Sequence, residues 1–408
     1  MNKKAALFTV FLVVMIDLIG FGIVLPGLET YAAGLNASPL FSGIIYSSYS
    51  LAQLLFSPIW GSISDRVGRR PVMMFSTLGA SIAYLLFAFS NSLWMLLFCR
   101  IFAGIMAGNI SAAQAYVADV TAREDRAKGM GLIGAAFGIG FVVGPALGGV
   151  IMKFFPSDPF RVIGLLAAGL SALSFLLVMT RLPESRQKTV SNDADGRIIK
   201  VSIFTGSFWK YLAKINEESG GVFLGLLASV FLLTLGQASI YVAFPFFCRT
   251  RLSLPVSAVY RQYILMGLVA VFIQGGLIRV LVKKIPEKNL FWLGSLVLGT
   301  GLAAIPFSNS VQTLTALMIF MTVGASLAVP TLTSLVSKES TPENYGVTMG
   351  ISQSFSATAR AIGPTWGSAL LGVSLAAPFL ITGLLVLLTL WVGFRAKQPP
   401  PIDSQRKF

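Results

Sequence analysis

Gly-Ser-Ile-Ser-Asp-Arg-Val-Gly-Arg-Arg-Pro, residues 61–71, is the most informative segment of this 408-residue chain. Glycine and charged residues alternate in it, and an apolar stretch lies on either side, near residues 40 to 60 and 72 to 90. A charged turn between two apolar segments of this length is typical of a loop at a membrane surface. The stretch therefore indicates two membrane-spanning segments joined by a short loop.

Apolar windows of this kind recur along the whole chain. Hydrophobic residues make up 55% of it, charged residues only 12%, and its mean hydropathy is +0.78. About 20 consecutive apolar residues cross a bilayer as a helix, and continuous rather than alternating windows predict helices, not barrel strands. Twelve windows can be placed, near residues 5 to 28, 40 to 60, 72 to 90, 93 to 117, 128 to 152, 160 to 180, 221 to 247, 256 to 278, 289 to 307, 311 to 335, 345 to 371 and 375 to 394.

The second half of the chain repeats the first. Pro26 returns 219 residues later as Pro245, and a glycine-rich run returns at the same offset: Met130, Gly131, Gly144, Pro145 and Gly148 become Met349, Gly350, Gly363, Pro364 and Gly367. We therefore predict an all-α polytopic membrane protein with twelve transmembrane helices in two pseudo-symmetric six-helix bundles. Its expected parts are an N-terminal bundle (1–181), a central cytoplasmic loop (182–220) and a C-terminal bundle with a short cytoplasmic tail (221–408).

The net charge of +15 raises the question of a nucleic-acid partner, and the distribution of charge argues against one. With both termini inside, 24 of the 31 Lys and Arg residues fall in cytoplasmic segments and 5 in external ones. This asymmetry follows the positive-inside rule. Nucleic-acid binding would need a basic surface on a soluble folded element, and the longest stretch outside the windows is 182–220. We expect attraction to anionic membrane lipids instead.

Two segments leave alternatives open. The first window begins with Lys3 and Lys4, as a signal peptide does, but Asp17, Pro26 and the lack of a clear small-residue cleavage site favour a retained helix. Residues 203–215 mix apolar and basic side chains. They predict either an amphipathic helix along the inner membrane surface or a plain linker.

The residue types exclude several kinds of chemistry. The chain has no histidine, and its two cysteines, Cys99 and Cys248, lack a spacing that suits a metal or a disulfide framework. No GxxxxGK[ST] phosphate loop occurs. We therefore expect neither an enzyme nor a bound metal or cofactor, and a proton relay would have to use carboxylates.

With these motifs the chain resembles the major facilitator superfamily. Residues 61–70 match its loop motif, G-x-x-x-D-R-x-G-R-R, at every defining position, and the repeat extends the resemblance over nearly the whole chain. The motif would form a cytoplasmic latch, in which Asp65 meets the positive end of the eleventh span near Tyr345 and Arg69 pairs with Asp119. The alternative is that these charges only fix topology. The expected latch residues are Gly61, Asp65, Arg66, Gly68, Arg69, Arg70 and Asp119.

Three further motifs narrow the resemblance to a branch. Residues 17–26 are similar to the opening helix of the tetracycline and multidrug efflux transporters, and residues 100–108 to the fourth-span arginine motif of proton-driven exporters. Small residues in the fifth window, which let helices pack closely, resemble the pattern that marks antiporters, although ordinary helix packing is the alternative. They are Gly131, Gly140, Gly144, Pro145, Gly148 and Gly149.

Asp17 and Arg100 are the expected proton-coupling residues. Asp17 lies about a dozen residues, or roughly 18 Å, from the inner end of its helix, where an ionised acid costs about 2.5 to 3.5 kcal/mol. It should therefore face a water-filled cavity or hold its proton. Arg100 stays charged and would shift the proton affinity of Asp17 or lie on the proton path. The alternatives for Arg100 are a structural ion pair or bonds to helix carbonyls.

Polar and aromatic residues on several windows are expected to converge on a substrate cavity, although polar side chains in membrane helices often only bond neighbouring helices. Arg360 would bind an anionic part of the substrate or replace a proton-linked group. The expected cavity residues are Phe21, Tyr46, Tyr49, Gln53, Asn109, Gln114, Phe137, Gln237, Tyr241, Gln353 and Arg360.

The resemblance implies a monomeric proton-coupled antiporter that exports a small amphiphilic or lipophilic compound across a bacterial inner membrane. A symporter or lipid translocase of the same fold is one alternative. A non-transporting receptor or scaffold, which would tolerate Asp17→Asn, is another. The third and ninth windows lack the acids that tetracycline exporters carry there, so we do not expect a tetracycline pump.

Overall fold

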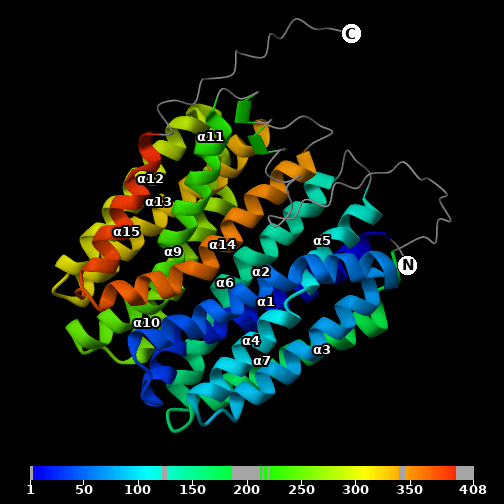
Figure 1. Ribbon diagram of the computed structural model, residues 1–408, viewed down its shortest axis with the longest axis horizontal. Helices are drawn as coiled ribbons and strands as arrows, with labels where there is room; N and C mark the ends of the chain where they lie inside the picture. The colour runs from blue at the N-terminus through cyan, green and yellow to red at the C-terminus, as the bar shows by residue number, and fades with distance from the viewer. Residues whose placement is uncertain are drawn as a thin grey trace, which may run out of the picture.

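The computed structural model describes residues 3–121, 126–185, 212–213, 216–217, 221–339 and 345–391, and the regular elements in these ranges are helices (Figure 1). The first half of the chain forms α1 (Lys3–Gly34), α2 (Pro39–Val67), α3 (Arg69–Ala88), α4 (Leu93–Met106), α5 (Asn109–Val120), α6 (Arg126–Phe154) and α7 (Pro159–Arg181). The second half forms α9 (Val222–Leu252), α10 (Val256–Phe272), the π-helix η2 (Ile273–Leu277), α11 (Ile278–Lys284), α12 (Glu287–Ala304), the 3-10 turn η3 (Ile305–Phe307), α13 (Val311–Lys338), α14 (Tyr345–Leu371) and α15 (Ala377–Leu387).

The helices confirm the predicted all-α membrane architecture. Nine helical segments of the described chain are long and apolar enough to cross a bilayer, with α4 and α5 counting as one. The more polar helices α2 and α14 and the shorter apolar segment Ala377–Trp391 complete the twelve expected spans. The segment expected to be an amphipathic helix or a linker, residues 203–215, lies outside the described residues except for 212–213.

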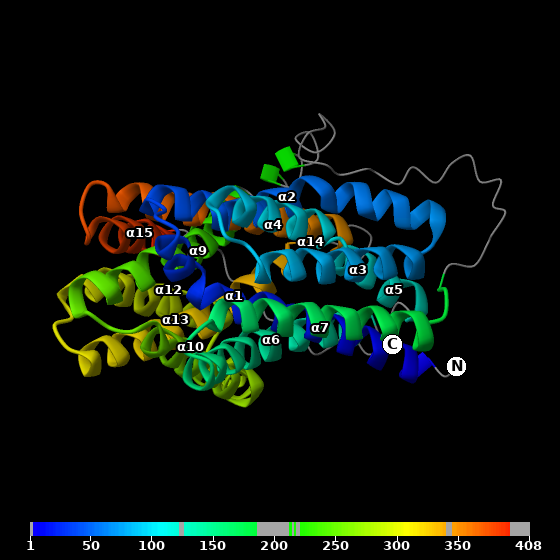
Figure 2. The ribbon, with the colours of Figure 1, turned by 90° about the horizontal axis from the view of Figure 1, so that it is seen from below.

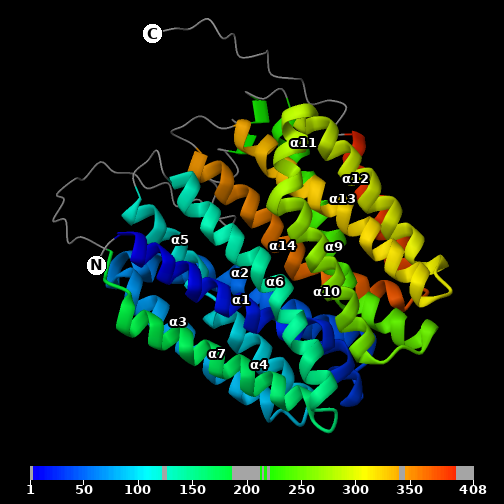
Figure 3. The same cartoon turned by 180° about the vertical axis from the view of Figure 1, so that it is seen from behind.

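The two halves form two bundles that meet chiefly through α1, α2 and α6 of the first half and α9, α10 and α14 of the second. Within the bundles, α1 packs on α6 and α7, and α12 packs on α13 and α15. Between them, α2 lies along α14, α6 along α10 and α1 against α9. Figure 2 shows α14 beside α2, and Figure 3 shows α10 beside α6. Helices α1, α2 and α6 of the first half therefore face α9, α10 and α14 of the second.

The contacts that can be located along these pairs lie toward one end. We call the end with the turn at residues 61–71 the motif end and the opposite one the far end. In the far half of the molecule, Ser47 Oγ bonds Thr365 Oγ1 at 2.8 Å, and a Cβ on Gly148 would meet the ring of Tyr260 at 2.2 Å. Toward the motif end, a Cβ on any of several glycines of the same helices would meet nothing within 4 Å: Gly134, Gly138, Gly275, Gly276 and Gly350. The bundles are closed at the far end and separated at the motif end.

Glycines bring α1 and α6 into backbone contact. A Cβ on Gly144 would lie 2.8 Å from the Cα of Gly22, and one on Gly22 would lie 3.0 Å from the carbonyl oxygen of Gly140 and 3.4 Å from Pro145 Cδ. Backbone atoms cannot move aside as a flexible side chain can. The small residues of the fifth window thus hold α1, which carries Asp17, directly against α6.

Gly144→Ala is expected to lower the stability of the protein by roughly 1–3 kcal/mol, because the added methyl group overpacks a backbone contact. Gly134→Ala is the matched control on the same helix, where the methyl group meets nothing within 4 Å. Alanine favours a helix over glycine by about 1 kcal/mol, so this control should be neutral or stabilising. Thermal unfolding of both purified variants measures the difference, and equal melting temperatures would contradict the assigned contact.

The fourth predicted window is broken rather than continuous. Its helix stops at Met106 and restarts at Asn109, because Trp60 Nε1 donates to the Ile105 carbonyl at 2.6 Å, the acceptor that the Asn109 N–H would use in a continuous helix. Ser76 bridges the break: its hydroxyl donates to the Met106 carbonyl and accepts from the Asn109 N–H. An inserted side chain is one of the known causes of a sharp interruption in a helix. The break lies beside the cavity described below.

Candidate functional site

Asp17 lines a small cavity inside the first bundle. The cavity measures about 30 Å³, room for one or two water molecules, and is formed by residues of α1 to α5 that include Tyr49, Tyr84 and Asn109. Asp17 Oδ1 and Asn109 Nδ2 are buried and have no hydrogen-bond partner among the described residues. The Ser174 hydroxyl of α7 lies close enough to affect Asp17 electrostatically, without a bond of standard geometry. Buried polar groups of this kind are normally satisfied, so the cavity is suited to hold water.

Arg100 lies deep in α4, where it is 2% exposed. Its guanidinium carbon stands 4.6 Å from the ring centre of Tyr49 and 5.6 Å from that of Phe21. Both contacts are within the range of cation–π attraction. Arg100 Nε and Nη1 are buried without a hydrogen-bond partner, and no ion pair within the described chain joins Arg100 to Asp17. The arginine is therefore held by aromatic faces rather than by a carboxylate.

Tyr84 lies near both Asp17 and Arg100, and no sequence motif identifies it. It lies on α3, is 5% exposed and lines the Asp17 cavity. Its phenol interacts electrostatically with both Asp17 and Arg100. A lone tyrosine in an apolar window carries no motif, so only the packing of α3 against the other helices identifies it.

The second bundle places Arg360 opposite this group. Arg360 of α14 donates to Ser356 Oγ at 2.7 Å, one helical turn away. Its charge reaches both Tyr241 of α9 and Tyr49 of the first bundle. Tyr49 also packs on Phe21, with ring centres 4.7 Å apart. The structure thus brings residues of both halves close to one another.

The remaining expected cavity residues divide into three groups. Gln53, Gln114 and Gln237 are partly exposed, and Gln353 is exposed on the same face of α14 as Arg360. Tyr46 lies instead toward the far end, stacked on Tyr241 with ring centres 6.3 Å apart. Phe137 is placed only as part of α6, because its surroundings lie outside the described set, and the same holds for Gly131 of the expected packing residues.

The charges of the motif form a cluster within the first bundle. Arg69 Nη1 lies 2.5 Å from Asp65 Oδ1, and Arg69 Nε donates to Asp119 Oδ2 at 3.1 Å, the pairing that the sequence predicted. Asp65 is 58% exposed, and a Cβ on Gly61 would meet nothing within 4 Å. The close contacts expected of Asp65 and Gly61 with a neighbouring helix stay predictions for a state in which the motif ends meet.

Glu184 adds a contact that the motif does not reveal. Its two carboxylate oxygens accept hydrogen bonds from the backbone N–H groups of Arg69 and Arg70, at 2.9 and 3.1 Å. A carboxylate suits the positive N-terminal end of a helix, here α3. Gly68 turns the chain just before it with φ +112°, and a Cβ there would lie 2.4 Å from Glu184. Glycine at this position thus serves both the turn and the cap.

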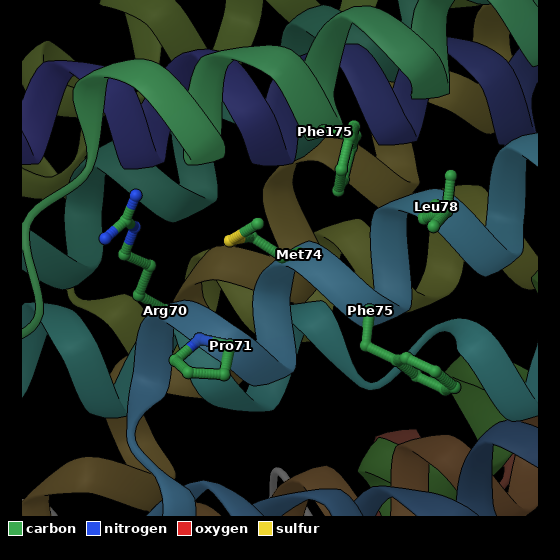
Figure 4. Close-up of a pocket in the computed structure, with 6 residues that line it drawn as sticks. All are labelled: Arg70, Pro71, Met74, Phe75, Leu78 and Phe175. Carbon is green, nitrogen blue, oxygen red and sulfur yellow. The ribbon is translucent and has the colours of Figure 1, made fainter.

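A larger groove lies away from these residues, between α3 and α7. It measures about 300 Å³ and is lined by Arg70, Pro71, Met74, Phe75, Leu78 and Phe175 (Figure 4). Phe75 and Leu78 are 57% and 41% exposed. An exposed apolar lining on a membrane-spanning helix is what contact with lipid requires. The groove belongs to the outer face of the bundle and is separate from the Asp17 cavity.

Comparisons with known proteins agree with this arrangement. The Major Facilitator Superfamily profile matches residues 10–364 and 277–408. The class D tetracycline resistance protein of Salmonella ordonez is 30% identical over 379 residues, 89% of this chain and 88% of that protein. Multidrug resistance protein 2 of Bacillus subtilis is 27% identical over 398 residues, 95% of this chain and 94% of that protein. The crystal structure of the human organic anion transporter MFSD10 (TETRAN) superposes with a TM-score of 0.69 at 25% identity, over 96% of this chain and 100% of that one.

The matched profile covers more than half of the chain, and the relatives align over most of their lengths. The relatives are transporters and not enzymes. Multiple apolar helices make the protein an integral membrane protein. The chain belongs to the major facilitator superfamily and is a membrane transporter related to the drug-efflux proteins of that family.

Proposed function

We propose that this protein is a proton-coupled antiporter that exports small amphiphilic or lipophilic compounds, with Asp17 as its proton-binding residue. The observation that carries the proposal is the position of Asp17. Its carboxylate faces a small cavity midway along α1, and one of its oxygens is buried without a hydrogen-bond partner. A buried carboxylate without a partner is costly when ionised, so a proton held there in one state is released in another.

The proposed transport cycle alternates between two arrangements of the bundles, residues 1–181 and 221–408, which the segment 182–220 joins. We place the motif end and both termini in the cytoplasm of a bacterium, with the monomeric protein in the inner membrane. The structure then corresponds to an inward-facing state, because its bundles touch at the far end. In the opposite state, the cluster of Asp65, Arg69 and Asp119 would latch the cytoplasmic side.

The residues expected to line the substrate cavity favour an amphiphilic substrate. Phe21, Tyr49 and Tyr241 offer aromatic surface of the kind that binds apolar ligands. Arg360 interacts with Tyr241 and Tyr49 and would bind an anionic group of the substrate. The human relative named an organic anion transporter supports the same preference.

Coupling requires that proton and substrate favour opposite states. A ligand that binds both states equally shifts neither. In the proposed cycle Asp17 releases its proton to the cytoplasm, substrate binds, the bundles rock, and a proton from outside favours release of the substrate. Tyr84 and Arg100 would set how readily Asp17 gives up its proton.

Purified protein in proteoliposomes tests the direction of coupling. Vesicles with an acidic lumen receive ethidium, a lipophilic cation, or fluorescein, an organic anion, on the outside. An antiporter exchanges luminal protons for dye, so a dye that is a substrate should accumulate inside only while the gradient lasts. Accumulation of neither dye nor any member of a wider panel of amphiphiles would contradict the proposal.

A symporter or lipid translocase of the same fold gives different results. A symporter accumulates substrate when the outside is the acidic side, so reversing the gradient separates it from an antiporter. A lipid translocase would move a fluorescent phospholipid between leaflets and leave both dyes outside. The depth of Asp17 suits antiport and symport alike, and the relatives that confer drug resistance favour antiport.

A further inference from the structure

Glu29 is a second buried carboxylate, at the far end of α1. It is 1% exposed, and its Oε1 accepts a hydrogen bond from Arg249 Nη2 at 2.8 Å. Its Oε2 is buried without a hydrogen-bond partner among the described residues. Arg249 belongs to α9 of the other bundle, and its side chain is 42% exposed. This ion pair therefore joins the two halves directly.

The pair lies close to the pseudo-symmetry axis. The repeat relates Pro26 of α1 to Pro245 of α9. Glu29 and Arg249 follow these prolines by three and four residues, so equivalent turns of equivalent helices face each other. A relative movement of the bundles that opens the far end must separate this carboxylate from its guanidinium.

The backbone of α1 beside Glu29 is also tied to its neighbours. The Tyr46 hydroxyl of α2 donates to the Leu25 carbonyl and accepts from the Glu29 N–H at 3.3 Å, the two groups that an α-helix pairs with each other. The Tyr260 hydroxyl of α10 donates to the Ile23 carbonyl at 2.9 Å. The Tyr260 bond therefore ties α1, six residues before Glu29, to the second bundle, and the Tyr46 bonds hold the Glu29 turn to α2 within the first bundle.

We propose that Glu29 is a second proton-binding site, at which a proton and Arg249 compete for one carboxylate and so control closure of the far end. The inference rests on the proposed proton-coupled transport, which supplies the need for an outer proton site. With Arg249 in place, the ionised carboxylate is neutralised and the far end closes. With the far end open, Glu29 meets outside water and can take a proton, and a protonated Glu29 cannot hold Arg249 as an ion pair.

The other groups around Glu29 carry no charge that could compete with Arg249 for the carboxylate. On α9 the Cys248 thiol interacts with it, on α2 the Tyr46 phenol, and on α1 itself the Thr30 hydroxyl. The α10 phenols of Tyr260 and Tyr263 act on Tyr46 in turn. These groups are uncharged at neutral pH.

The charged residues at the far ends of the remaining neighbours, α6 and α7, are engaged elsewhere. Lys153 lies over the ring of Phe154, Arg161 lies over that of Phe89, and the Asp158 carboxylate accepts from the Arg161 N–H at the start of α7. Within the described chain, Arg249 is thus the charged group that interacts with Glu29.

Spin-label distances across the far end test the proposal. Labels on the exposed positions Asn91 of the first half and Val373 of the second report opening, and the native Cys99 and Cys248 are buried. The protein carries Asp17→Asn in lipid nanodiscs, so that this acid does not titrate. Acidification should raise the ratio of open to closed molecules roughly tenfold, because protonation removes a partly buried ion pair.

Two variants make the test sharp. Glu29→Gln should be open at every pH and show no pH dependence. Arg249→Gln should reverse the sign: acid should now favour the closed state, because a buried carboxylate without its cation is stable only when protonated. The double variant Glu29→Gln/Arg249→Gln, with two neutral partners, should close again and stay independent of pH.

Either of two results would overturn the proposal: a native pH response in Glu29→Gln, or the native sign of the response in Arg249→Gln. The measurement uses neither substrate nor gradient. A failure to find proton-coupled export is therefore recorded separately, in the dye experiment, and leaves the distance result unchanged.

Discussion

Asp17→Asn is expected to reduce gradient-driven dye accumulation to the level of protein-free vesicles while the protein remains folded in the membrane. Asparagine has nearly the same size but neither binds nor releases a proton. No hydrogen bond to Oδ1 is lost, since this oxygen has no partner among the described residues. The substitution also removes a carboxylate that burial makes costly to ionise, so the melting temperature should stay equal or rise.

Asp158→Asn is the matched control for this prediction. Asp158 caps the start of α7, where its carboxylate accepts from the Arg161 N–H at 3.4 Å. Asparagine caps a helix as well as aspartate does, so both stability and transport should be retained. Loss of accumulation in Asp17→Asn but not in Asp158→Asn would assign the effect to the first position. Retained gradient dependence in Asp17→Asn would reject its role.

Arg100→Met is expected to stop proton-coupled transport and to leave the protein at least as stable. Arg100 is 2% exposed, and two of its nitrogens have no hydrogen-bond partner. A buried charge with unpartnered nitrogens is costly to desolvate, so an apolar side chain of similar length should leave the melting temperature equal or higher. Methionine can fill the space between Phe21 and Tyr49, but it supplies no positive charge to the group around Tyr84 and Asp17.

The combination of lost function and undiminished stability separates two explanations for Arg100. A structural arginine would lower the melting temperature when replaced, and transport would fall only with the amount of folded protein. Arg161→Met serves as control, because Arg161 lies over the ring of Phe89 at the far end, away from the cavity. It should change neither melting temperature nor accumulation. Lower stability with full coupling in Arg100→Met would contradict the proposal.

The sequence predicted those features that depend on a repeat or on a regular spacing of residues. Long apolar windows predicted the spans, including α2 and α14, which are more polar than the others. The charged turn at 61–71 predicted that Arg69 would pair with Asp119. The depth of Asp17 within the first window also led to the expectation that its side chain faces a cavity or holds its proton. Each of these inferences depends on composition or spacing within a short stretch, which a single sequence displays.

Contacts between distant segments could not be predicted in this way. Arg249 is 220 residues from Glu29, and Glu184 is 115 residues from the helix start that it caps. The break in the fourth span depends on Trp60 and Ser76, which lie on other helices. Tyr84 gains its position between Asp17 and Arg100 only when α1, α3 and α4 pack together. No local pattern records such contacts.

The most direct test of the central claim is the movement of protons driven by substrate. Proteoliposomes enclose the pH-sensitive dye pyranine and start without a pH difference, and a gradient of a transported dye is then imposed from outside. If Asp17 exchanges its proton for substrate, the lumen should become alkaline as dye enters and protons leave, and Asp17→Asn vesicles should show no change. Acidification of the lumen, or an equal alkaline shift in Asp17→Asn, would contradict the account.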